Sequence, residues 1–190
     1  MTFDTLADYL LEKALFTNED LVLIKSYAVM KRVTKRDFIF KTGEICKHMI
    51  FVSKGLLRLF RVDDNGNDYI IRFASETSWM SERESYLTGQ PSNYSIEAIE
   101  NSEVLIWKKE DFRYLLDQIP ALKVVMKSLL EKNQIATQHR VFTSMSSSAE
   151  EKYRQFIETQ PGIFNRLPLH MVASYLGLSR KTLSRIRNTS

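Results

Sequence analysis

A short basic segment near the end of the chain carries the residues best suited to binding a ligand. At helical spacing, Leu183 and Ile186 fall on one face of this segment. The other face carries Ser179, Arg180, Lys181, Ser184, Arg185 and Arg187. An arginine can bond O6 and N7 of guanine together, while serine and lysine side chains can hold phosphates. These residue types at this spacing predict contact with double-stranded DNA.

The residues before this segment predict the elements that would position it. Pro168 suits a first helical turn, and Val172, Ala173 and Leu176 fall on one face of the helix that would follow. Gly177 can take the positive φ of a tight turn, and Ser179 can cap a second helix. The small side chain of Ala173 would let that second helix cross closely. This pattern is typical of a helix-turn-helix, although a purely structural helical hairpin would show the same apolar residues.

The distribution of charge favours the same interpretation. The net charge of +4 comes from 27 Lys and Arg against 23 Asp and Glu. Residues 1–143 contain 20 basic and 20 acidic side chains, and residues 144–190 contain 7 basic and 3 acidic ones. A neutral body with a basic end is typical of a nucleic-acid-binding chain, although an ordinary basic helix terminus is the alternative.

Composition excludes several classes of protein. Cys46 is the one cysteine, so an internal disulfide, a four-cysteine zinc site and a cysteine-held iron–sulfur cluster are excluded. No apolar run approaches the length of a membrane helix. The region rich in strand-forming residues holds one histidine, His48, and no common catalytic motif occurs. We expect a cytoplasmic protein that is not an enzyme, with no membrane contact, catalytic residue, metal or cofactor.

The pattern of apolar residues divides the chain into zones. Residues 1–30 predict helices, with a helix start at Asn18–Asp20. From Lys31 to Trp107 the chain is rich in β-branched and aromatic residues, and turn signals divide it into short segments. Asn65–Gly66 is the best hairpin signal among them. The spacing predicts a β-sandwich or β-roll.

The helical period returns after this zone. We predict a short helix over Glu110–Gln118, ended by Pro120, and a long helix over residues 121–145. The long helix carries a stripe formed by Leu122, Val125, Met126, Leu129 and Leu130, which continues more weakly through Ile135, Ala136, His139 and Phe142. The stripe favours a homodimer through helix 121–145, and its alternative partner is the chain's own β-domain. The serine-rich segment 144–148 predicts a hinge, followed by a helix over 149–159.

A β-roll, a long helix and a terminal helix-turn-helix in this order resemble the Crp/Fnr superfamily of bacterial transcription regulators. The resemblance implies an α+β fold: an N-terminal double-stranded β-helix (jelly-roll, cyclic-nucleotide-binding-like) with flanking helices, a long dimerisation helix and a helical DNA-binding end. The expected domains are residues 1–120 for an effector, 121–145 for dimerisation and 146–190 for DNA. The family's homodimers bind pseudo-palindromic operators, and RNA polymerase is a further partner of this class.

The resemblance assigns roles within the basic segment. Arg180, Lys181 and Arg185 would occupy the base-reading positions. The cyclic-AMP receptor has an acidic residue where Lys181 stands, so a different operator sequence is implied, because a carboxylate accepts hydrogen bonds from cytosine whereas a lysine donates. We expect no full β-hairpin wing after Arg187.

The resemblance also places a small-molecule site in the β-roll. A cyclic-nucleotide cassette has a Gly–Glu pair followed, after a short helix, by Arg–Ser or Arg–Thr. Here Glu82 falls at the ribose position, but Ser81 replaces the glycine, and Ser92 and Asn93 replace the Arg–Ser pair, with Arg83 nearby. Without that arginine, a charge-assisted contact to phosphate is lost. We expect a degenerate pocket that does not bind cyclic AMP and holds an unknown effector or none. The alternatives are a regulator that responds to cyclic AMP or cyclic GMP, and a regulatory binding module that does not bind DNA.

Overall fold

The computed structural model describes residues 2–189, in two compact units. The first contains the chain up to Leu59 together with Phe73–Leu130. The second contains Phe60–Arg72 and the chain from Glu131 onward. The long helix and one β-hairpin contribute residues to both units, so the units are not consecutive stretches of sequence.

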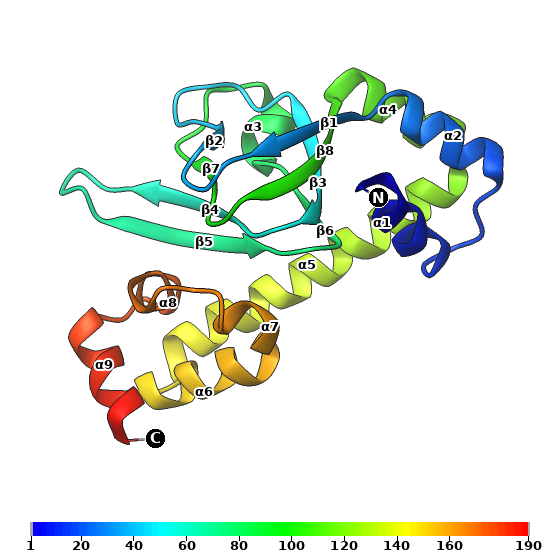
Figure 1. The fold of residues 1–190 in the computed structure, drawn as a ribbon. Helices are drawn as coiled ribbons and strands as arrows, with labels where there is room; N and C mark the ends of the chain where they lie inside the picture. The colour runs from blue at the N-terminus through cyan, green and yellow to red at the C-terminus, as the bar shows by residue number, and fades with distance from the viewer. Residues whose placement is uncertain (1, 190) are drawn as a thin grey trace. The chain divides into compact units, whose positions relative to one another are not determined.

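Short strands form two antiparallel layers (Figure 1). One sheet has the order β1-β8-β3-β6 and the other the order β2-β7-β4-β5. The strands are β1 Val29–Val33, β2 Phe38–Phe40, β3 His48–Lys54, β4 Leu57–Val62, β5 Asp68–Ala74, β6 Ser78–Met80, β7 Ser95–Ala98 and β8 Ser102–Lys108. The predicted β-roll is therefore confirmed.

Strands β3 and β8 are apolar on both faces. Ile50 and Val52 of β3 point into an inner core between the two sheets, and Phe51 between them points into a second core. Strand β8 repeats this alternation, with Val104 in the inner core and Leu105 in the second one. Successive side chains of a strand point to opposite faces, so a continuous apolar run predicts a sheet covered on both sides.

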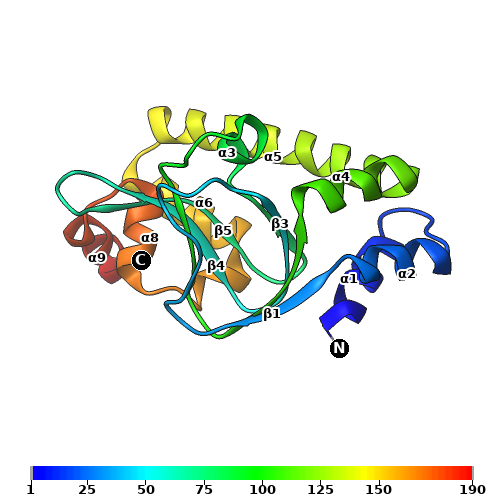
Figure 2. The same ribbon diagram turned by 90° about the horizontal axis from the view of Figure 1, so that it is seen from above.

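Helices cover the outer face of this sheet (Figure 2). They are α1 Thr2–Leu11, α2 Asn18–Ser26, α4 Lys109–Gln118 and the first turns of α5 Pro120–Ser146. The core beneath them is aromatic, and the ring of Trp79 lies 5.3 Å from that of Trp107 and 5.5 Å from that of Phe112. Trp107 Nε1 donates a hydrogen bond to Ile24 O at 3.0 Å, which ties β8 to α2. Because this donor is buried, the bond avoids the cost of an unpaired polar group.

The long helix begins and ends close to the predicted positions, but its apolar stripe lies in the chain's own core. Leu122 and Val125 are buried in the outer core, and Met126 and Leu129 pack against it. The first half of the stripe therefore follows the alternative interpretation, packing on the chain's own β-domain. Helix α5 also continues through Ser146, so only the last residues of the predicted 144–148 hinge lie outside helices.

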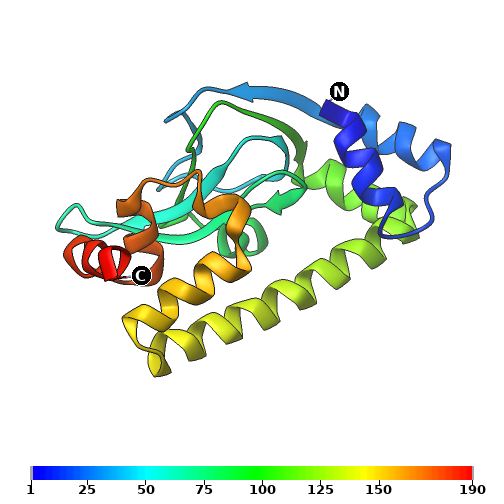
Figure 3. The same ribbon diagram turned by 60° about the horizontal axis from the view of Figure 1, so that its bottom comes forward.

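The second unit contains the predicted C-terminal helices and one short helix, Pro161–Phe164, that was not predicted (Figure 3). They are α6 Ala149–Thr159, α7 Pro161–Phe164, α8 Leu169–Leu176 and α9 Arg180–Thr189. Ser148 caps α6: its hydroxyl accepts from Glu151 N at 3.2 Å, while Glu151 Oε2 accepts from Ser148 N at 2.7 Å. This reciprocal capping box fixes the point at which the chain reverses after α5. No helix within residues 2–189 is both long and apolar enough to cross a membrane.

Replacing Gly55, in the turn between β3 and β4, tests how closely the β-roll is packed there. Gly55 has a φ of +101°, and an added Cβ would lie 2.7 Å from Ser102 Cα. We expect Gly55→Ala to lower the free energy of unfolding by about 2–4 kcal/mol, because the positive φ and the steric clash both oppose it. Urea denaturation followed by circular dichroism measures the change.

Gly66→Ala is the matched control. Gly66 also has a positive φ, +81°, but an added Cβ would meet no atom within 4 Å. Only backbone strain applies there, so the expected loss is about 1 kcal/mol. Equal losses at the two glycines would contradict the steric argument.

Candidate nucleic-acid interface and effector site

Helices α8 and α9 form the predicted helix-turn-helix. Gly177 ends α8 in the left-handed conformation, with φ +66°, and Leu178 N donates to Ala173 O at 2.9 Å. Ser179 Oγ accepts from Thr182 N at 3.0 Å, which caps α9. A glycine C-cap followed at once by a serine N-cap makes the turn short and well defined.

The apolar residues of the motif form its interior. Val172 and Ala173 of α8 and Leu183 and Ile186 of α9 are buried, whereas Leu178, expected to be buried as well, is half-buried. The ring of Phe156 on α6 lies 5.2 Å from the ring of Tyr175 on α8. This packing sets which face of α9 is turned away from the interior of the unit.

The outward face of α9 is basic, as predicted. Arg180, Lys181, Arg185 and Arg187 are exposed, Ser184 is half-buried, and the capping residue Ser179 is exposed at the start of the helix. All six predicted DNA-binding residues thus lie on one helix or its N-cap. The N-terminal end of this helix also adds positive potential, which favours phosphate.

Within the second unit, the β4–β5 hairpin is bonded to the helix-turn-helix. Ser174 Oγ of α8 donates to Asp68 O at 2.5 Å and accepts from Ile70 N at 3.0 Å. The Arg140 guanidinium of α5 donates to Ile71 O and lies 4.9 Å from the centre of the Tyr175 ring. Neither Ser174 nor Arg140 was predicted from the sequence, because no spacing signal links residues so far apart in the chain.

The predicted effector residues surround a short helix, α3 Arg83–Thr88. Glu82 is its N-cap: the carboxylate accepts from Glu84 N at 3.1 Å and from Ser85 N at 2.9 Å. Both carboxylate oxygens of Glu82 are thereby bonded to the helix, and the side chain is buried. The helix ends at Gly89, which has a φ of +73°.

Ser92 also has bonds within the fold. Its N–H donates to Glu44 O at 2.9 Å, its carbonyl accepts from Gly43 N at 2.8 Å, and its Oγ accepts from Tyr94 N at 2.9 Å. The neighbouring Asn93 is exposed, as is Arg83, while Ser81 is half-buried. Arg83 is the first residue of α3 and the other four lie before or after it in sequence, but the two that are buried, Glu82 and Ser92, are bonded to backbone groups of the fold.

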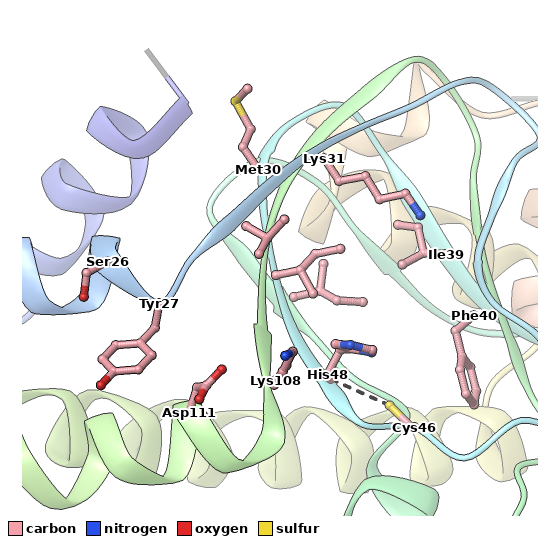
Figure 4. A pocket seen from close by; sticks show the side chains of 13 residues that line it. Ser26, Tyr27, Met30, Lys31, Ile39, Phe40, Cys46, His48, Lys108 and Asp111 are labelled. Atoms are coloured by element: carbon pink, nitrogen blue, oxygen red, sulfur yellow. Dashed lines mark hydrogen bonds between the residues drawn. The ribbon is translucent and has the colours of Figure 1, made fainter.

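A cavity of about 470 Å³ lies elsewhere in the first unit (Figure 4). Its walls come from β1, β2, β3 and β8, with Tyr27 and Asp111 on one side. None of the five predicted effector residues lines it. Among residues 2–189, no group of three or more His, Cys, Asp or Glu side chains is placed to hold a metal ion.

Comparison with known proteins agrees with this architecture. The family described as "Cyclic nucleotide-binding domain" matches residues 30–119. No curated protein sequence matches the chain.

Several solved structures share the fold. FixK2 from Bradyrhizobium japonicum is 15% identical, with a TM-score of 0.74 over 85% of this chain and 83% of its own. The global regulator CLP from Xanthomonas campestris, described as c-di-GMP responsive, is 11% identical, with a TM-score of 0.76 over 91% of each chain. A putative Crp/Fnr-family transcriptional regulator from Eubacterium rectale is 15% identical, with a TM-score of 0.70 over 92% of this chain and 83% of its own. Residues 30–119 therefore match the cyclic nucleotide-binding domain family, and the chain shares its fold with transcription regulators of the Crp/Fnr type.

Proposed function

We propose that this chain is a homodimeric, DNA-binding transcription regulator of the Crp/Fnr type. The observation that carries the proposal is helix α9, whose apolar face is buried in the helix-turn-helix and whose opposite face is basic and exposed. A helix held in this way can enter the major groove without disturbing the packing behind it. We assign residues 1–120 to effector binding, 121–145 to dimerisation and 146–190 to DNA binding.

The side chains of α9 have distinct roles in this proposal. Arg180, Lys181 and Arg185 read base edges, where an arginine discriminates guanine by two hydrogen bonds. Ser179, Ser184 and Arg187 contact phosphates and hold the register of the helix on the duplex.

Helix α5 is the dimerisation element, through the face opposite the one buried in the outer core. At seven-residue spacing, Ile135 and Phe142 lie on this outer face, and Val124 and Met145 lie beside them. All four are exposed, Phe142 by 69% and Met145 by 83%. Large apolar side chains in one stripe are typical of a surface that another chain covers. Pairing two such helices would set two copies of α9 about 34 Å apart for a pseudo-palindromic operator.

The region around α3 supports a degenerate cyclic-nucleotide pocket. Glu82 uses both carboxylate oxygens to cap α3, and no arginine stands at position 92 or 93 to neutralise a cyclic phosphate. The match to the cyclic nucleotide-binding domain favours a second candidate, a regulator that responds to cyclic AMP or cyclic GMP. The bonds of Glu82 and Ser92 to backbone groups of the fold favour the degenerate pocket.

Removing single arginines of α9 tests DNA binding. We expect Arg180→Ala and Arg185→Ala each to weaken binding to a duplex selected on the wild type by about 10- to 100-fold, the equivalent of about 1–3 kcal/mol per base contact. The salt dependence of binding should remain steep, because the other phosphate contacts are kept. Fluorescence anisotropy at several salt concentrations measures both quantities.

Arg113→Ala is the matched control, because Arg113 is an exposed arginine of α4 in the first unit. It should leave the affinity for DNA unchanged. Failure of the wild type to bind any duplex in a salt-dependent way would contradict the proposal that the chain is a DNA-binding regulator.

A charge on the outer face of α5 tests the dimer. We expect Phe142→Glu to raise the dimer dissociation constant at least tenfold, because pairing would bury an uncompensated carboxylate. Thr137→Glu adds the same charge to an exposed position on another face and should leave the dimer intact. Sedimentation velocity over a concentration series measures the dissociation constant, and a monomeric wild type would contradict the assignment.

Truncating Glu82 tests its role as a cap. We expect Glu82→Ala to lower the free energy of unfolding by about 1–2 kcal/mol, because two backbone N–H groups at the start of α3 lose their acceptor. Glu84→Ala, two residues away and exposed, should change it by less than about 0.5 kcal/mol. Chemical denaturation compares the two, and an unchanged stability for Glu82→Ala would contradict the role of its carboxylate as a cap.

A further inference from the structure

The cavity of about 470 Å³ in the first unit opens at the end of the inner core. Its floor is a row of apolar side chains across three neighbouring strands, since Val29 pairs with Ile106 and Ile106 pairs with Ile50. Ile39 and Phe40 of β2 form the facing wall. A concave apolar site of this volume is the usual size for a small molecule.

Two lysines and one histidine flank this apolar floor. His48 and Lys108 are directly paired residues of β3 and β8, two residues along each strand from the Ile50–Ile106 pair, so they extend the same face. On the other side of the floor, Lys31 extends toward Ile39, as Figure 4 shows. Side chains of two lysines and one histidine thus lie at the edges of the apolar floor.

Two lysines and one carboxylate line the cavity. Asp111 is the one carboxylate among the lining residues, and it lies beside Tyr27 (Figure 4). Burial lowers the pKa of His48, and the charges of Lys108, Lys31 and Lys47 lower it further, against the opposing effect of Glu110. Burial and nearby cations both favour the neutral form of a histidine. The neutral ring keeps one N–H donor.

We propose that this cavity binds a small organic acid, with its carboxylate at His48 and Lys108 and its apolar body against Ile50 and Ile106. The charge of Lys31 adds to the attraction from across the floor. The cavity therefore favours a ligand with both an apolar part and an acceptor group, since the floor offers no hydrogen bonds and the flanking side chains offer N–H donors. The cavity shares no lining residue with α9 or with the five residues predicted around α3, although Cys46 N in its wall donates to Ser85 Oγ of α3 at 2.9 Å. The test of this proposal does not depend on DNA binding.

The one cysteine of the chain provides a direct readout. Cys46 lines the cavity, is 3% exposed and is bonded through Sγ to His48 O at 3.7 Å. A bound molecule should shield this thiol from a disulfide reagent such as 5,5′-dithiobis(2-nitrobenzoic acid). We expect octanoate at millimolar concentration to slow the reaction of Cys46 at least tenfold. Octan-1-ol and octylammonium, which share the apolar body but lack the carboxylate, should slow it less than threefold.

Single substitutions test which side chains of the cavity bind the carboxylate of octanoate. Lys108→Gln and His48→Gln should each raise the octanoate concentration needed for half-protection about tenfold, and Lys31→Gln about threefold. Lys123→Gln, at an exposed lysine of α5 outside the cavity, is the control and should leave it unchanged. Circular dichroism confirms that each variant is folded before the comparison is made.

Three outcomes would overturn the proposal. They are no protection of Cys46 by octanoate, equal protection by octan-1-ol, and half-protection concentrations that Lys108→Gln and His48→Gln leave unchanged. Protection by cyclic AMP in place of octanoate would also overturn it and would favour a cyclic-nucleotide site. None of these outcomes bears on the affinity of α9 for DNA, so failure here and failure of the regulator proposal remain distinguishable.

Discussion

The structure of the first unit depends on two strands that face two cores at once. Phe51 of β3 and Trp107 of β8 pack into the outer core, and Ile50 and Val104 on the same strands pack into the inner one. A strand pair of this kind cannot slip by one residue, because a slip would exchange the residues of the two cores. The register between β3 and β8 therefore fixes the positions of two layers at once. These are the helices over the outer face and the second sheet over the inner face.

The same register determines where the inner core ends. Along β3 the inner-facing positions are Val52, Ile50 and then His48, and along β8 they are Val104, Ile106 and then Lys108. The apolar filling stops where these side chains become polar and the strands end. A polar side chain keeps its charged or hydrogen-bonding end near water, so it does not close the core as a leucine would. The cavity is thus a consequence of the sequence pattern and not a packing defect elsewhere in the roll.

Local patterns were enough to predict most elements, and contacts between distant residues were not. The helix-turn-helix followed from Ala173, Gly177 and Ser179 because caps and turns are properties of a few adjacent residues. The role of Glu82 as the cap of α3 and the bonds of Ser174 to the β4–β5 hairpin could not be read in this way. The first depends on a helix too short to show a period, and the second joins residues about a hundred positions apart. Burial of Cys46 in a cavity wall likewise needs the full topology.

Helix α5 shows why a stripe alone does not identify its partner. The stripe at Leu122 and Val125 has the spacing expected of a coiled coil, yet the outer core covers it. The opposite face is less continuous in sequence, because polar residues interrupt it between Val124, Ile135 and Phe142. In the single chain these three side chains are exposed. Burying an apolar side chain of this size contributes about 1.5–3 kcal/mol. The face proposed for dimerisation therefore has the weaker sequence pattern of the two, and pairing through it would leave the core of each subunit unchanged.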